Sequence, residues 1–204
     1  MIGDRWKSEI REFKDGKTGR AIQQLTTIGN NVHLYFTENS FDLRKREIIF
    51  RSDRASGESR APHESPHYDL FRMNLDSGEI EQLTDEPETV DASGNVTKTP
   101  DSQLIVYHTG KKLKLLDTTT GKISVVYAET GNFTVRAPSI APNRRYLAFA
   151  RNEDVRIPRG PNYSGFKESF YRIKDGRITL AYLDGSGWFD VFKDTHWTAH
   201  FQFC

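Results

Sequence analysis

Apolar residues along this chain occur in short runs separated by Asp, Ser, Thr and Gly, and few of them follow the 3.6-residue spacing of an amphipathic helix. Runs such as residues 104–107 and 124–127 have the length of single strands. A membrane-spanning helix needs about 20 apolar residues, and no run in the sequence approaches that length. The pattern therefore predicts an all-β protein in which antiparallel strands are joined by tight turns.

Two signals recur along the chain. The first is a turn with proline followed by a strand: TPDSQLIVY at residues 99–107 returns as APNRRYLAF at residues 141–149, so the two prolines lie 42 positions apart. The second is a hairpin with glycine where the turn needs a positive φ. It reads LDSGEIEQLT at residues 75–84, LDTTTGKI at 116–123 and, more loosely, LDGSGWF at 183–189. A period of about 40 to 50 residues is typical of β-propeller blades.

The repeats divide the 204 residues into parts of an incomplete β-propeller. We expect blades at residues 30–86, 88–130 and 132–194, and the start of a fourth at 196–204. Residues 1–29 form an N-terminal segment in which 18–26 resembles the second half of the hairpin signal, which predicts a ring-closing outer strand. Closed propellers have about four to eight blades, so the sequence predicts a fragment. Because an open ring exposes strand edges, we expect the isolated chain to be weakly stable or to aggregate.

Two irregular stretches interrupt this pattern. Residues 156–165 are rich in Pro and Gly, and residues 54–67 contain two prolines, two histidines and several charges. Both stretches predict surface loops.

Composition narrows the possible partners and the compartment. The 29 Lys and Arg residues balance 28 Asp and Glu residues and are interspersed with them, which argues against a nucleic-acid partner. The N-terminus has acids and bases where a signal peptide would have an apolar core, and we expect no membrane association. The single cysteine, Cys204, excludes an intrachain disulfide and a cysteine metal cluster. These features predict a cytoplasmic protein.

Candidate binding residues come from the strands expected to line the propeller channel. His33 and Tyr35 begin the first complete blade, Arg51 follows in the same blade, and His200 occupies the position in the fourth blade that corresponds to His33. We predict that these four residues face a substrate. A purely structural role is the alternative. In that case His33 would cap a strand, Tyr35 would pack between blades, and His200 would make its hydrogen bonds within the fold.

Other candidate groups have weaker support. His63 and His67 lie four apart, but this spacing suits a metal only on a helix, and the intervening Pro66 argues against one. Several cations could hold carboxylates through charge-assisted hydrogen bonds or simply form a solvated face: Arg51, Arg54, Arg60, Lys111 and Lys112. The sequence has no G-x-S-x-G elbow, P-loop or dinucleotide glycine pattern.

Several segments, taken in order, resemble the amino-terminal half of the oligogalacturonate lyases, polysaccharide lyase family 22. The resemblance covers essentially the whole chain and rests on GDRW at residues 3–6, TGR at 18–20, QLT at 24–26, HLYFT at 33–37, IIFRSDR at 48–54 and HWTAHFQF at 196–203.

This resemblance implies a seven-bladed propeller that cleaves short oligogalacturonides by β-elimination during pectin catabolism inside bacterial cells. It also implies a histidine that acts as the base and a divalent ion, Mn²⁺ in this family, that is held by histidines and a glutamine of later blades. The chain ends before those blades, so none of its residues is assigned a catalytic or metal-binding role, and we expect the chain alone to be inactive.

Two alternatives remain open at this level, because propellers host many functions. One is a non-catalytic TolB-like or WD-like propeller that binds proteins, for which we would expect exposed apolar patches and indifference to metal. The other is the propeller domain of a prolyl-oligopeptidase-like hydrolase. The sequence leaves the oligomeric state undetermined.

Overall fold

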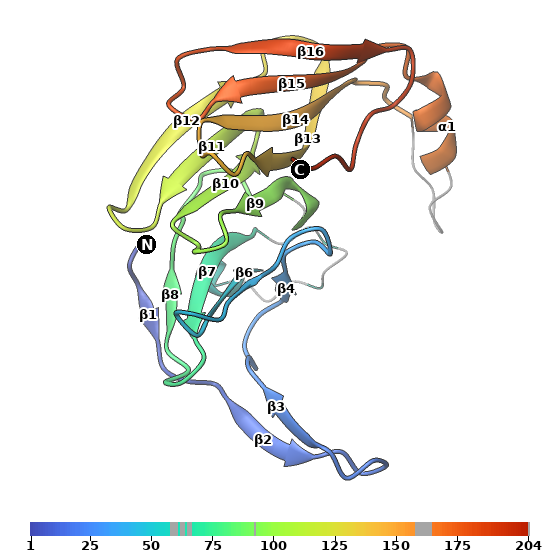
Figure 1. Ribbon diagram of the computed structural model, residues 1–204. Helices are drawn as coiled ribbons and strands as arrows, with labels where there is room; N and C mark the ends of the chain where they lie inside the picture. The colour runs from blue at the N-terminus through green and yellow to red at the C-terminus, as the bar shows by residue number, and fades with distance from the viewer. Residues whose placement is uncertain (58–60, 62–63, 65–66, 92, 158–164, 204) are drawn as a thin grey trace. The chain divides into compact units, whose positions relative to one another are not determined.

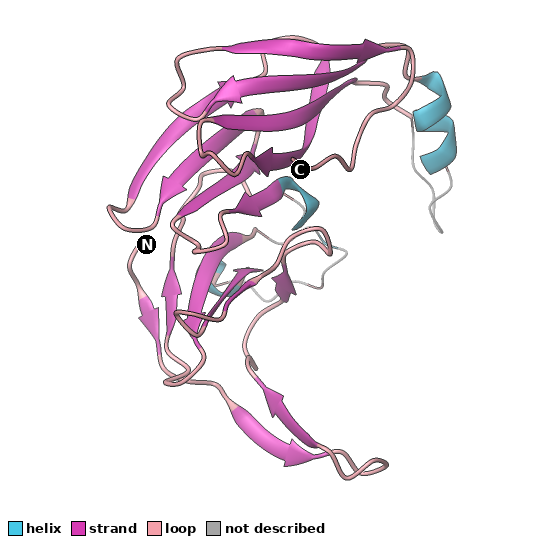
Figure 2. Cartoon of the chain, in the orientation of Figure 1, coloured by secondary structure: helices cyan, strands magenta, loops and turns pink. Residues whose placement is uncertain are grey.

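The computed structural model describes residues 1–57, 61, 64, 67–91, 93–157 and 165–203. The chain divides into two compact units, Met1–Ser93 and Gly94–Cys204. Strands dominate both units (Figures 1 and 2), and no described helix is long and apolar enough to cross a membrane. The predicted all-β class is confirmed.

The first unit is built on one antiparallel sheet. Its strand order is β1-β8-β7-β6-β4, and β5 also pairs with β6. A short 3₁₀ helix, η1 (Arg54–Ser56), follows β6. The strands of this sheet are β1 (Arg5–Trp6), β4 (Asn31–His33), β5 (Phe41–Asp42), β6 (Glu47–Ser52), β7 (Asp69–Asn74) and β8 (Ile80–Gln82).

The second unit contains two four-stranded antiparallel sheets, each a meander in which neighbours in sequence are neighbours in the sheet. Its described residues also form a helix, α1 (Phe166–Arg172), and a 3₁₀ turn, η3 (Ser93–Asn95), lies at the border between the two units. The first sheet comprises β9 (Val96–Lys98), β10 (Leu104–Thr109), β11 (Lys112–Asp117) and β12 (Lys122–Ala128). The second comprises β13 (Phe133–Ile140), β14 (Tyr146–Glu153), β15 (Gly176–Tyr182) and β16 (Trp188–Asp194).

The predicted proline turns join the first two strands of each sheet in the second unit. Ser102 and Arg144, each two positions after the proline, have φ values of 53° and 56°. In each turn their N–H groups donate to the carbonyl of the residue before the proline, at 2.8 Å. The repeat in the sequence is therefore a repeat in backbone geometry, and the predicted strands that follow it form β10 and β14.

The N-terminal hairpin contains a strand within residues 18–26, where one was predicted, and a partner strand that was not predicted. Ala21–Gln24 forms β3, but it pairs with β2 (Arg11–Lys14), a strand that the repeats did not reveal. The turn is of the same kind as the turns of the β7–β8 and β11–β12 hairpins. In all three, a glycine at positive φ donates its N–H to the carbonyl four residues earlier, at 2.8–2.9 Å. The glycines are Gly19, Gly78 and Gly121.

Buried apolar side chains stabilise each unit. In the second unit Leu147, Phe149 and Ala181 are fully buried and cluster with Val106, Leu113 and Tyr127 of the neighbouring sheet. In the first unit the core consists of Phe50, Phe71, Met73 and Ile80, with Trp6 packed edge-on against Phe71 at 5.5 Å between ring centroids. Full burial of such side chains contributes about 1.5–3 kcal/mol each, so packed sheet faces are the main stabilising element.

Candidate functional site

His33 lies at the end of β4, the strand at one side of the first unit's sheet. It stands opposite Phe50 in the register, so both side chains project from the same face. The imidazole is exposed, and its Nδ1 lies against the carbonyl oxygen of Leu34. This position leaves the rest of the ring accessible to a ligand.

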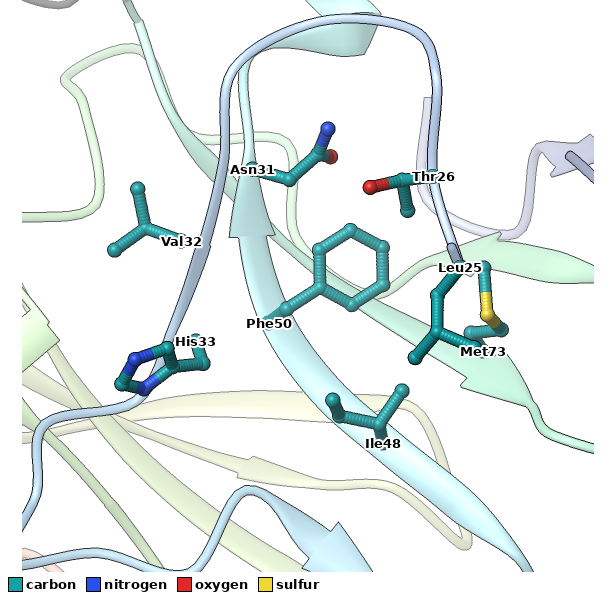
Figure 3. A pocket seen from close by; sticks show the side chains of 8 residues that line it. All are labelled: Leu25, Thr26, Asn31, Val32, His33, Ile48, Phe50 and Met73. Atoms are coloured by element: carbon teal, nitrogen blue, oxygen red, sulfur yellow. The ribbon is translucent and has the colours of Figure 1, made fainter. Parts of the chain in front are cut away.

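A pocket of about 100 Å³ opens beside His33 (Figure 3). Its apolar floor is formed by Leu25, Ile48, Phe50 and Met73, and its remaining lining residues are Thr26, Asn31, Val32 and His33. The Asn31 amide already donates to the carbonyls of Ile28 and Gly29, at 3.0 Å each. Among the lining residues, His33 is the titratable group.

Tyr35 belongs to the loop that follows β4 and does not line this pocket. Its ring is half-buried and lies 4.2 Å from that of Phe36, centroid to centroid. The loop is anchored by Leu34, which is fully buried and donates its N–H to Ser40 Oγ at 2.9 Å. Tyr35 is thus near His33 in sequence but outside the pocket.

Arg51 projects from the other face of the sheet, because it neighbours Phe50 on β6 and strand side chains alternate. Its side chain is buried, donates from Nη2 to the carbonyl of Val90 at 2.7 Å, and stacks over Tyr68 at 4.4 Å. Burial lowers the pKa of the Arg51 guanidinium, and the nearby Asp91 opposes that change. The structure therefore separates Arg51 from His33.

Arg54, which the sequence placed in a surface loop, has a fully buried side chain. It pairs with Glu9 at 2.7 Å and also donates to Asn31 Oδ1 at 2.9 Å. Burial alone would raise the pKa of Glu9, but the N–H groups of Thr27 and Ile28 and the Arg54 cation lower it overall. This cluster ties the N-terminal segment to the sheet, and its partners are too distant in sequence for a local pattern to reveal.

His200 lies in the second unit, in the segment that follows β16. It is exposed, has a φ of 56°, and meets the ring of Trp197 edge-on at 5.9 Å. Asn152 holds the same segment by donating to the Thr198 carbonyl at 2.9 Å and accepting from its N–H at 2.8 Å. A Cβ at Gly176 would overlap the carbonyl oxygen of His196, so this glycine allows the close approach of the segment.

A charged cluster that the sequence did not predict lies inside the second unit. Arg151 donates to Glu129 at 2.8 Å and lies 3.3 Å from Asp190, and its guanidinium is 4.6 Å from the Phe133 ring centroid. Arg177 joins the cluster through Asp190 at 2.8 Å and through two hydrogen bonds to Asp175 at 2.7 Å. The Tyr127 hydroxyl also donates to Glu129, at 2.5 Å. These closed contacts indicate a structural role.

The carboxylates of this cluster predict an acid-sensitive second unit. Arg177 and Lys193 lower the pKa of Asp175 to about 2. Burial alone would raise the pKa values of Glu129 and Asp190, but their hydrogen bonds and cation partners lower both overall. Groups with depressed folded pKa values stabilise the fold above their unfolded pKa of about 4, and that stability is lost as the pH falls toward about 2.

We therefore expect the urea concentration at the unfolding midpoint of the second unit to decrease as the pH is lowered from 4 to 2. Asp190→Asn should be less stable than the wild type at pH 7 and should lose less stability on acidification. An Asp190→Asn profile parallel to that of the wild type would contradict this assignment.

The structure describes only one member of the histidine pair His63 and His67. His63 and Arg60 lie outside the described residues, and His67 lies 3.8 Å from the Asp69 carboxylate. Within residues 1–57, 67–91, 93–157 and 165–203, no three His, Cys, Asp or Glu side chains cluster in a way that could hold a metal ion. The described residues therefore do not fit a Mn²⁺ centre.

Sequence comparisons place this chain in no family: no family model matches it, and neither does any curated protein. Solved structures do match. An oligogalacturonate lyase in complex with manganese is 16% identical with a TM-score of 0.81, over 98% of this chain and 51% of that one. The oligogalacturonate lyase of Vibrio parahaemolyticus is also 16% identical at 0.81, over 99% and 51%. The putative TolB of Agrobacterium tumefaciens is 14% identical at 0.51, over 98% and 69%.

At this level of identity the likeness concerns the fold alone. The predicted resemblance is confirmed at that level, since the two lyase structures match far better than the TolB structure. The chain has the β-propeller fold of oligogalacturonate lyase structures and spans about half of their length.

Proposed function

We propose that this chain is part of a β-propeller lyase that cleaves short oligogalacturonides by β-elimination, and that its residues shape the substrate channel instead of performing the chemistry. The observation that supports the proposal is the TM-score of 0.81 with two oligogalacturonate lyases, over 98% and 99% of this chain. The chain spans about half of those proteins. We therefore propose, for the whole protein, the lyase activity, the Mn²⁺ requirement and a cytoplasmic location.

The proposed reaction assigns the described residues to binding and not to catalysis. In β-elimination a base removes the proton alpha to the uronate carboxylate, and the electron pair forms a C=C bond as the glycosidic C–O bond breaks. The site needs a base and a positive charge that stabilises the developing enolate. His33 is the one titratable lining residue of the described pocket, and a metal cluster is absent from the described ranges.

An elimination assay tests this division of roles. We expect the purified chain to release no unsaturated uronate from oligogalacturonides, with or without added Mn²⁺, as followed by ultraviolet absorbance. Boiled protein and an active pectate-cleaving enzyme are the negative and positive controls. Metal-dependent product formation by the chain alone would overturn the proposed channel-wall role.

We expect the exposed imidazole of His33 to contact the uronate. His33→Ala should weaken oligogalacturonide binding about 5- to 10-fold, as expected for loss of one hydrogen bond to a charged group. Tryptophan fluorescence during titration measures the change. His67→Ala is the matched control, because His67 does not line the pocket. Equal affinities of the two variants would remove His33 from the proposed channel.

A TolB-like or WD-like platform is the competing function. The TM-score of 0.51 with the TolB structure supports a shared propeller architecture. It is lower than the scores with the two lyase structures, so it favours this function less. Such a platform would bind no uronate at all, and this distinguishes it from the lyase proposal.

A further inference from the structure

A β-bulge interrupts β13, the first strand and an edge strand of its four-stranded sheet (Figure 1). The register with β14 shifts after Arg136, where two residues of β13, Ala137 and Pro138, oppose one residue of β14. Bulges of this kind redirect neighbouring side chains and are frequent beside active sites. In a propeller the first strand of each blade faces the central channel, so the bulge lies on the strand of this blade that a ligand in the channel would meet.

The backbone of this bulge is held in an uncommon conformation. Ala137 has a φ of 51°, in the left-handed region that residues other than glycine rarely adopt. Its N–H donates to Oδ1 of Asn95, a residue of η3 that is only 3% exposed, at 3.1 Å. The next residue, Pro138, is buried and has no N–H to pair with β14. Strained backbone that its surroundings fix in this way is concentrated at functional sites.

The side chain beside the bulge is an uncommitted cation. Val135 packs into the core and is 4% exposed, so its neighbours Thr134 and Arg136 project from the opposite face of the sheet. Arg136 is exposed, and its guanidinium forms no hydrogen bond or ion pair with any residue that the structure describes. The other strand arginines of this sheet, Arg151 and Arg177, are both paired with carboxylates.

The segment that follows β16 lies on the same face as Arg136. Asn152 of β14 is the cross-strand partner of Thr134, and cross-strand partners project from the same face. The Asn152 side chain also hydrogen-bonds the N–H and the carbonyl of Thr198. The segment that carries His200 therefore passes over the face from which Arg136 projects.

We propose that Arg136 binds a carboxylate of the uronate substrate through two parallel N–H···O hydrogen bonds. This inference rests on the proposed function and extends it to a specific contact in the second unit. Each sugar of an oligogalacturonide carries one carboxylate, and the planar guanidinium matches the two oxygens of that group. The fixed bulge orients the arginine, and the guanidinium has no carboxylate among the described residues that a ligand would have to displace.

Calorimetric titration of the full chain with a short oligogalacturonide and with its fully methyl-esterified form tests this contact. Arg136→Gln should weaken binding of the acid about tenfold or more and leave binding of the ester unchanged, because the ester has no charge to pair. Arg136→Lys should recover part of the loss, since lysine keeps the charge but lacks the planar fork. Arg172→Gln is the control: it removes the same charge from an exposed arginine of α1 and should bind like the wild type.

Urea unfolding separates this role from a structural one. Arg136→Gln should unfold at the wild-type urea concentration, because the guanidinium has no partner among the described residues. A marked loss of stability, or an equal loss of affinity in Arg136→Gln and Arg172→Gln, would overturn the contact. If the wild type prefers the acid and Arg136→Gln binds it equally well, the contact is wrong and the proposed function stands. If the wild type binds neither ligand, or both equally, the contact and the proposed function fail together.

Discussion

Arg151→Ala is expected to destabilise the second unit by about 3–5 kcal/mol, the usual cost of leaving the partner of a buried ion pair alone. The side chains of Arg151 and Glu129 are only 6% and 2% exposed. Removing the guanidinium leaves the Glu129 carboxylate buried without its cation and also removes the stacking on Phe133 and Trp188, whose ring centroids lie 4.6 and 4.7 Å from it. Urea unfolding, with amide exchange of β13–β16 as a local readout, measures the loss.

Arg144→Ala is the matched control for this prediction. Arg144 also pairs with an aspartate, Asp101, at 2.6 Å, but the two side chains are 41% and 33% exposed. Exposed pairs contribute about 0–1 kcal/mol. If Arg151→Ala and Arg144→Ala lose similar stability, the buried cluster is not a determinant of the fold.

Arg54→Ala is expected to have an effect of similar size, about 3–5 kcal/mol, in the first unit. The Arg54 side chain is 0% exposed and its partner Glu9 is 7% exposed. The guanidinium also lies 5.5 and 5.6 Å from the ring centroids of Phe50 and Phe71. Its loss should free the N-terminal segment, so limited proteolysis should cleave near the β2–β3 hairpin before the sheet unfolds.

Arg46→Ala provides the comparison within the same unit. Arg46 pairs with Asp76 at 2.6 Å, and both side chains are about 60% exposed. We expect this variant to unfold and to be cleaved like the wild type. A proteolysis pattern for Arg54→Ala that matches the Arg46→Ala pattern would show that the Glu9 contact does not hold the segment.

Local repeats made much of the fold predictable. The glycines Gly78 and Gly121 predicted hairpins, and both adopt positive φ in turns of the same geometry. The proline turns near Ser102 and Arg144 likewise recur as backbone structure. These signals are readable because a turn is specified by residues within four or five positions of one another.

Longer-range features left no such signal. The strand Arg11–Lys14 and the helix Phe166–Arg172 belong to none of the repeats. Arg51 illustrates the limit for site residues: its place on a strand was predictable, but the face on which it lies depends on register with β4 and β7. The pairings of Glu9 with Arg54 and of Arg151 with Asp190 join residues about 40 positions apart, which a single sequence does not connect.

Calorimetric titration of the chain with a short oligogalacturonide, beside a neutral oligosaccharide of equal length, tests the proposed function most directly. We expect the uronate to bind without turnover, and we expect its binding to be weakened by His33→Ala and also by salt, because the ligand is anionic. Binding of neither sugar, or equal binding of both, would contradict a role in an oligogalacturonide lyase.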